Sequence, residues 1–118
     1  MLLYGAMLKA PGFHHLHLNS VDPETAIDFY VRQFPASAKT SWGGLPALAA
    51  PNDVLVLFTR VPTAPATSPQ TAIWHFGWHV TDTRASLESY QARPDVELLR
   101  AMMIEGPSRE AIELVEIA

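Results

Sequence analysis

Two segments of this chain decide its fold: FHHLHLNSVDPETAIDFYVR over residues 13–32 and IWHFGWHVTDTRASLESYQA over residues 73–92. When they are aligned without a gap, at a shift of 60 residues, the identical pairs are His15 with His75, Asp22 with Asp82, and Tyr30 with Tyr90. In each segment an apolar, strand-like stretch is followed by an Asp and then by apolar residues at helical spacing. The sequence therefore predicts an internal duplication, in which each copy is a strand followed by a capped helix.

The turn between strand and helix is the clearest local signal in both copies. Asp is a favoured N-cap because its carboxylate accepts hydrogen bonds from the first helical amides, and Pro23 suits the first helical position. Proline also ends a helix, because it has no amide hydrogen to donate. The expected elements are strands at 13–19 and 73–80, N-caps at Asp22 and Asp82, and helices that end before Pro35 and Pro94.

Each helix is followed by further strand-like stretches. The candidates are residues 47–50 and 54–59 in the first half, and residues 96–99, 101–104 and 111–117 in the second half. Residues 54–59 (VLVLFT) are almost entirely apolar, which predicts burial on both faces. Residues 61–71 contain three prolines and three threonines and predict an extended linker. We therefore predict one α+β domain over residues 1–118, with modules at 12–60 and 72–118 around a linker at 61–71.

The composition limits the classes of function. With 48% hydrophobic and 17% charged residues, 118 residues are enough to bury a core. The net charge is −4 and no basic cluster is present, which argues against nucleic-acid binding. The chain has no cysteine, so disulfides and thiolate metal sites are excluded, and we expect a cytoplasmic protein. Residues 1–9 are too short to span a membrane and lack a charged leader, so we expect no targeting role and no membrane partner.

All five histidines fall in the two matching strands. Because side chains alternate along a strand, His15 and His17 share one face and His14 is expected on the opposite face. By the same rule, His75 and His79 share a face. If the two copies pack around a pseudo-twofold axis, His15 and His75 occupy equivalent places and converge.

A carboxylate inside a later apolar strand supplies a third candidate ligand. Glu113 lies within AIELV at residues 111–115, and a buried carboxylate needs a cation or hydrogen-bond donors beside it. Two imidazoles and one carboxylate suit Fe(II), Mn(II), Ni(II) or Zn(II). The alternatives are that the histidines bond to backbone in a core or a dimer interface, and that Glu113 faces water, which is the role we expect for Glu116.

These motifs resemble the vicinal oxygen chelate superfamily, which includes glyoxalase I, bleomycin-resistance proteins and extradiol dioxygenases. The resemblance spans roughly residues 12–118 and rests on HLHL at 15–18 with Asp22 and Phe29-Tyr30, on HFGWH at 75–79 with Asp82, and on Gly106-Pro107 with IELVE at 112–116. It implies two βαβββ modules that form an open, barrel-like cleft. It also implies that His15, His75 and Glu113 hold one divalent metal, with Fe(II) favoured over Mn, Ni or Zn.

The resemblance further implies a metal-dependent enzyme that acts on a small substrate with vicinal oxygens. A dioxygenase-like reaction stands slightly ahead of a glyoxalase-type lyase or isomerase reaction. His17 and His79 are the candidates to move protons, since imidazole titrates near neutral pH. The alternative is a metal-free, antibiotic-sequestering protein of the same fold, and a third possibility is a module that only dimerises. A homodimer is expected.

Two departures from the family pattern concern the site. Glyoxalase-type sites also take an acid from the last strand of the first module, but residues 54–58 contain none, and only Asp53 stands at the edge. Residues 96–109 are compressed, so we expect a shortened second module. Trp42 is expected in a flexible loop, where it either lines a pocket or packs in an ordinary way. Arg60 is expected either to bind an anionic substrate or to be a solvated strand end.

Overall fold

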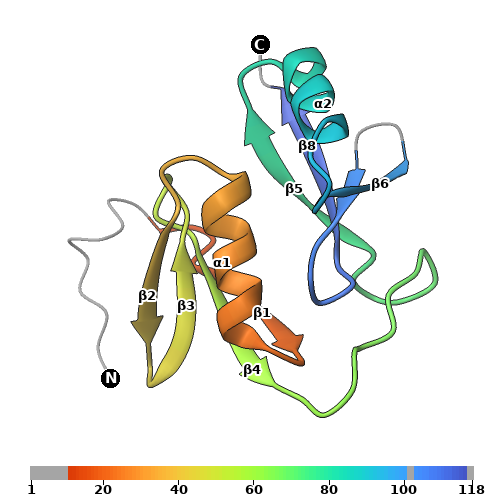
Figure 1. Cartoon of the computed structure of the whole chain (residues 1–118). Coiled ribbons are helices and arrows are strands. Elements are labelled where there is room, and N and C mark those ends of the chain that lie inside the picture. The colour runs from red at the N-terminus through yellow and green to blue at the C-terminus, as the bar shows by residue number, and fades with distance from the viewer. Residues whose placement is uncertain (1–10, 101–102, 117–118) are drawn as a thin grey trace. The chain divides into compact units, whose positions relative to one another are not determined.

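The computed structural model describes residues 11–100 and 103–116 (Figure 1). The expectation for residues 1–9, and the ends of two expected strands at 101–102 and 117, lie outside the described residues. The chain divides into two compact units, Met1–Ala64 and Pro65–Ala118, and the boundary falls inside the expected linker. In the described ranges no helix is long and apolar enough to cross a membrane.

The two units have the same topology. The first contains β1 (His15–Ser20), α1 (Pro23–Gln33), β2 (Ala38–Trp42), β3 (Leu45–Ala49) and β4 (Leu55–Arg60). The second contains β5 (His75–Val80), α2 (Thr83–Gln91), β6 (Glu97–Arg100), β7 (Met103–Glu105) and β8 (Ala111–Glu116). The sheets have the orders β1-β4-β3-β2 and β5-β8-β7-β6, and in each the first strand pairs in parallel with the last. The predicted α+β duplication of βαβββ modules is therefore confirmed.

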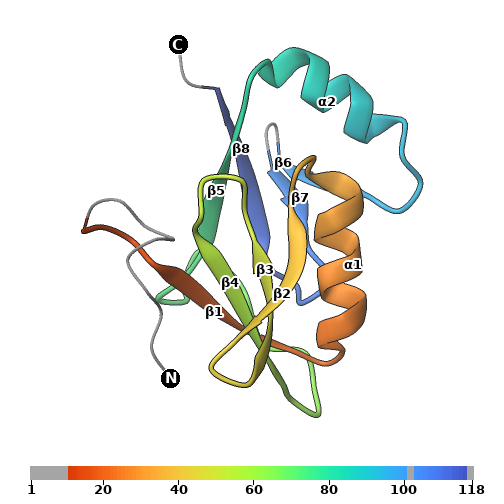
Figure 2. The same ribbon diagram turned by 90° about the vertical axis from the view of Figure 1, so that its left-hand side faces the viewer.

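The first unit is built on the apolar strand β4. All residues of β4 from Leu55 to Phe58 are buried, as predicted, so β4 is covered on both faces. Helix α1 lies against one face of this sheet (Figure 2), where the Tyr30 and Phe58 ring centroids are 6.2 Å apart. The helix itself contributes six buried residues: Pro23, Ala26, Ile27, Phe29, Tyr30 and Gln33.

Both predicted helix caps are confirmed. The Asp22 side chain accepts a hydrogen bond from the Thr25 amide at 3.3 Å, and the Asp82 side chain accepts one from the Ala85 amide at 3.0 Å. Helix α2 has a second acceptor at its start, because Glu116 Oε1 accepts from the Thr83 amide at 2.8 Å. Glu116 is exposed, as expected, and also satisfies an amide that the helix leaves without an internal partner.

Strand β2 was not expected, and the prediction that Trp42 lies in a flexible loop is wrong. Trp42 is the last residue of β2, and a hairpin joins it to Leu45. Gly43 and Gly44 form the connection with φ of 59° and 80°, the left-handed values that a two-residue hairpin turn requires. The strand escaped notice because residues 38–41 are exposed and show no apolar alternation.

The second unit is shortened, as predicted. Strands β6 and β7 have four and three residues, whereas β2 and β3 have five each. A turn between Gly106 and Glu110 joins β7 to β8, and inside it the buried Glu110 carboxylate accepts from the Ser108 amide at 2.7 Å. A Cβ atom at Gly106 would overlap that carboxylate, so any larger residue there would force the Glu110 side chain to move.

Candidate functional site

The parallel pair of β5 and β8 places two of the predicted metal ligands on one face of the second sheet. Gly77 lies directly opposite Glu113, and directly opposed residues share a face. His75, two residues before Gly77, therefore points to the same side as Glu113. The opposite face of β8 is turned towards helix α2. Glu116 lies on that face, three residues after Glu113, and its carboxylate reaches the start of α2.

His75 and Glu113 contact each other across this face. His75 Nε2 lies 3.0 Å from Glu113 Oε1, and the two side chains are 25% and 41% exposed. Gly77 has no side chain to stand above the carboxylate, so the pair is accessible from solvent. The other ring nitrogen, His75 Nδ1, is buried and has no hydrogen-bond partner in the described part of the chain.

The third predicted ligand, His15, begins β1 in the first unit. It is half-buried and lies opposite Leu55, on the face that carries the buried cluster of Ala47, Leu55 and Leu57. Counting only residues that the structure describes, no group of three His, Cys, Asp or Glu side chains is arranged to hold a metal ion. The meeting of His15 with His75 and Glu113 therefore stays a prediction.

The register of the first sheet also identifies the true counterpart of Glu113. His17 lies opposite Leu57 in the first unit, just as Gly77 lies opposite Glu113 in the second. Leu57 therefore occupies the position where a glyoxalase-type acid was sought. Asp53 is not a counterpart, because it lies in the turn before β4, exposed and with φ of 71°.

His14 lies close to His15, contrary to the prediction that it faces the opposite side. The two Nδ1 atoms are 2.9 Å apart, and the ring centroids are 5.1 Å apart. Strand alternation does not fix the His14 side chain because β1 begins only at His15. The indole of Trp42 contacts both imidazoles, with centroid distances of 5.3 Å to His14 and 5.6 Å to His15. His14 and Trp42 are thus neighbours of the candidate ligand that the sequence did not indicate.

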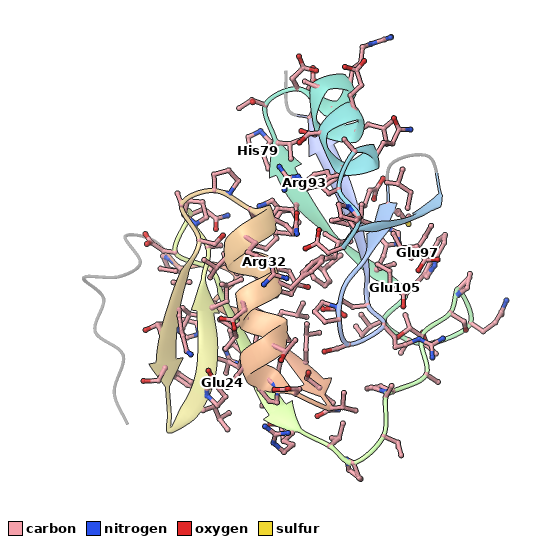
Figure 3. The ribbon with its side chains drawn as sticks, in the orientation of Figure 1. Glu24, Arg32, His79, Arg93, Glu97 and Glu105 are labelled. Atoms are coloured by element: carbon pink, nitrogen blue, oxygen red, sulfur yellow. The ribbon has the colours of Figure 1, made fainter. Side chains whose placement is uncertain are left out.

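The two candidate proton carriers lie on the same faces as the candidate ligands. His17 Nε2 is 2.6 Å from Thr59 Oγ1, on the neighbouring strand β4, and the imidazole is exposed. His79 is exposed on β5, two residues beyond Gly77 (Figure 3). Thr59 was missed at the sequence level, since only the pairing of β1 with β4 brings it beside His17.

Arg60 has a structural partner in its own unit. Its guanidinium donates to the Val21 carbonyl at 2.8 Å, and it lies 3.8 Å from the Asp22 carboxylate. Arg60 is therefore an exposed residue at the end of β4, which is one of the two predicted alternatives. Its contacts connect β4 to the loop before α1.

Two further carboxylates share the face of His75. Glu105 lies opposite Ala111, which itself lies opposite His75, and Glu97 lies opposite Glu105 (Figure 3). Arg109 offsets part of this charge, with its Nε 3.6 Å from Glu105 Oε2. The excess of negative charge favours a cation near this face. Sequence reasoning missed Glu97 and Glu105, because only the pairing of β7 with β6 and β8 brings them to this face.

The donor atoms of His75 and Glu113 fit a divalent metal. Imidazole nitrogen and carboxylate oxygen bind such ions at roughly 2.1 Å, so two of them at right angles stand about 3.0 Å apart. The observed Nε2–Oε1 distance of 3.0 Å has this value, which is also the length of an ordinary hydrogen bond. The donor types and their spacing therefore suit two ligands of a divalent metal, and the same distance suits an ion pair.

Comparisons with known proteins identify the fold. No protein-family profile matches the chain, and no curated protein sequence matches it either. Among solved structures, it resembles the fosfomycin resistance protein FosX of Listeria monocytogenes, with a TM-score of 0.66 and 12% identity over 89% of this chain and 90% of FosX. It also resembles TnmS3, an antibiotic binding protein of Streptomyces sp. CB03234, with a TM-score of 0.66 and 16% identity over 94% and 99% of the two chains.

A third similar structure is the trypanothione-dependent glyoxalase I of Leishmania major, with a TM-score of 0.63 and 14% identity over 91% of this chain and 87% of the enzyme. The chain therefore has the fold of the vicinal oxygen chelate superfamily, and the resemblance found in the sequence is confirmed for the fold. At such low identity the fold does not select an activity, because the similar structures include both enzymes and binding proteins.

Proposed function

We propose that this chain is a divalent-metal-dependent enzyme that acts on a small substrate with vicinal oxygens. His75 and Glu113 supply two ligands, and His15 of the first unit supplies the third. The observation that carries this proposal is the 3.0 Å approach of His75 Nε2 to Glu113 Oε1 on one accessible sheet face. When bound, the metal would polarise the oxygens of a chelating substrate, and Fe(II) is favoured for an oxygenase-type reaction.

An ordinary ion pair explains this contact less completely. Both side chains are partly exposed, and an exposed pair of this kind adds little stability. A role in ligand binding accounts for polar groups that the fold itself does not need.

In this proposal, His17 and His79 transfer protons to and from the substrate. His17 is held through its Nε2 atom by Thr59, so its orientation is fixed while its ring stays exposed. A fixed, solvent-accessible imidazole can accept a substrate proton and return it. His79 has the same accessibility in the second unit. We favour a dioxygenase-like reaction slightly over a lyase or isomerase reaction.

A metal-free binding protein is the second candidate function, and the first unit favours it. There Leu57 replaces the acid, and Trp42 packs with Leu45 and Ala49 against the cluster of Ala47, Leu55 and Leu57. An apolar and aromatic face of this kind suits the sequestration of an antibiotic without chemistry. The likeness to TnmS3, an antibiotic binding protein, points the same way.

Metal analysis separates the two functions. We expect the chain, purified without a nickel column, to bind one equivalent of Fe(II), Mn(II), Ni(II) or Zn(II). His75→Ala and Glu113→Gln are each expected to weaken binding by at least about 100-fold. Glu116→Gln is the matched control, because it removes a carboxylate from the same strand while its amide oxygen still accepts from Thr83.

The outcomes decide between the candidates directly. Binding of none of the four metals by the wild-type chain would overturn the enzyme proposal and leave the binding protein. Equal loss of binding in Glu116→Gln and Glu113→Gln would show a general effect of charge rather than a ligand. Light scattering on the same samples tests the proposed homodimer.

A further inference from the structure

We infer that His14 is a positioning residue that holds the His15 imidazole in the tautomer whose Nε2 atom can bind a ligand. This inference deepens the proposed function and rests on it, because His15 is there the metal ligand from the first unit. His14 has no part in the residue set that the family resemblance implies. All three residues concerned, His14, His15 and Trp42, belong to one unit.

The distance between the two imidazoles is that of a hydrogen bond between their Nδ1 atoms. Their Nδ1 atoms are 2.9 Å apart, which is a hydrogen-bond distance. In such a contact one Nδ1 atom carries the hydrogen and the other offers its lone pair. Two arrangements are therefore available, according to whether His15 or His14 is the donor.

Only one of these arrangements leaves His15 able to bind a metal. If His15 donates from Nδ1, its Nε2 atom is unprotonated and offers a lone pair outward. If His14 donates instead, neutral His15 carries its hydrogen on Nε2 and cannot bind there. A ligating histidine generally donates its other N–H to an acceptor, and that acceptor fixes the tautomer and the ring orientation. Here the His14 Nδ1 atom is placed to be that acceptor.

Trp42 keeps the two imidazoles in this arrangement. The centroid of its indole lies 5.6 Å from that of the His15 ring, with a 34° angle between the ring planes. The centroid of the His14 ring lies 5.3 Å away, at an angle of 61°. The indole also packs against the apolar cluster of Ala47, Leu55 and Leu57, so it is anchored in the sheet. A side chain held on both sides loses rotamer freedom, which keeps the Nδ1 atoms within hydrogen-bond distance.

Two substitutions at His14 separate the hydrogen bond from the ring packing. His14→Phe keeps an aromatic ring beside Trp42 but removes the acceptor. His14→Asn loses the ring, but its side-chain oxygen can occupy the place of Nδ1 and accept from His15. The asparagine variant is therefore the conservative one for hydrogen bonding, although it is the less conservative for packing.

The first measurement is made on metal-free wild-type protein at a pH where imidazole is neutral. Nitrogen-15 NMR of the ring atoms reports which nitrogen of each histidine carries the hydrogen. We expect His15 to be protonated at Nδ1 and unprotonated at Nε2, and His14→Phe to lose this preference. His15 protonated at Nε2 in the wild type would overturn the inference, whatever metal the protein binds.

The second measurement is the affinity for Zn(II) by titration calorimetry. His14→Phe is expected to weaken binding about 10- to 100-fold, the usual effect of removing the partner of a ligating histidine. His14→Asn is expected to stay within about threefold of the wild type. Wild-type affinity in a folded His14→Phe variant would overturn the inference and leave the metal site intact. Failure of the wild type to bind Zn(II), with the expected NMR result, would overturn the metal site and leave the His14–His15 bond established.

Discussion

The two units share one topology but divide their polar and apolar residues differently. In the first unit α1 buries six residues and β4 is buried on both faces, whereas α2 of the second unit buries only Tyr90. At the matched position beside the first strand, the first unit has Leu57 and the second has Glu113. The duplicated fold therefore keeps the same strand pairing in both copies, although the first copy buries more of its helix and is apolar at the position where the second has a carboxylate.

The sharpest test of this comparison exchanges the matched residues. Leu57→Glu is expected to destabilise the protein by about 3–5 kcal/mol, because Leu57 is 1% exposed and the new carboxylate would be buried without a partner. Glu113→Leu is expected to change the free energy of unfolding by only about 0–1 kcal/mol, since its side chain is 41% exposed. Chemical denaturation of each variant measures both values.

Leu57→Met is the control for the exchange, and its cost is expected to stay below about 1.5 kcal/mol because volume and polarity are preserved. If Leu57→Glu unfolds no more easily than Leu57→Met, the face of the first sheet is open to water. The division between an apolar unit and a polar unit would then be wrong.

A second test compares the two helices at positions matched by the 60-residue shift. Ile27 of α1 is fully buried, and its counterpart Leu87 of α2 is half-buried. Ile27→Ala is expected to cost about 3 kcal/mol and Leu87→Ala about 1 kcal/mol, because the loss follows the apolar area removed from water and the cavity left behind. Thermal and urea unfolding supply the comparison. Equal losses would show that α2 is packed as tightly as α1.

The sequence predicted those parts of the fold that depend on neighbours along the chain. Asp22 and Asp82 act as caps through bonds to residues three positions away, so their roles follow from local spacing. The hairpin at Gly43 and Gly44 was also readable in principle, because two adjacent glycines favour the left-handed turn observed there. It was missed because the polar, exposed strand before it gave no alternation.

The candidate site was harder to predict because its contacts depend on strand pairing. The match with His15 and the alternation of side chains along the strand made His75 a candidate. Only the register of β5 with β8 brings Glu113 beside it. The same limit explains the error at His14, whose side chain follows no strand rule, and why Leu57 was not recognised as the counterpart of Glu113. Leu57 and Glu113 lie 56 rather than 60 residues apart, chiefly because β6 and β7 have four and three residues where β2 and β3 have five each.

The smallest expected effect concerns the two helix caps, which differ in one donor. Asp22 accepts from both the amide and the hydroxyl of Thr25, whereas residue 85, the counterpart of Thr25, is an alanine. The Thr25 hydroxyl, followed by its amide, lowers the pKa of the Asp22 carboxyl below its ordinary value of 3.8. Because the folded pKa is the lower one, this cap contributes stability above pH 3.8 and loses it as the pH falls through the folded pKa.

Thr25→Ala makes the first cap resemble the second and should therefore raise the pKa of Asp22 towards 3.8. Carbon-13 NMR titration of the Asp22 carboxyl measures the pKa in both proteins. In the variant, the backbone amide of residue 25 still donates a hydrogen bond to the Asp22 carboxylate. A small upward shift is expected, since the hydroxyl is the largest cause but the amide bond persists. An unchanged pKa would assign the lowering to the remaining contributors, among them Arg60, and the two caps would then be equivalent.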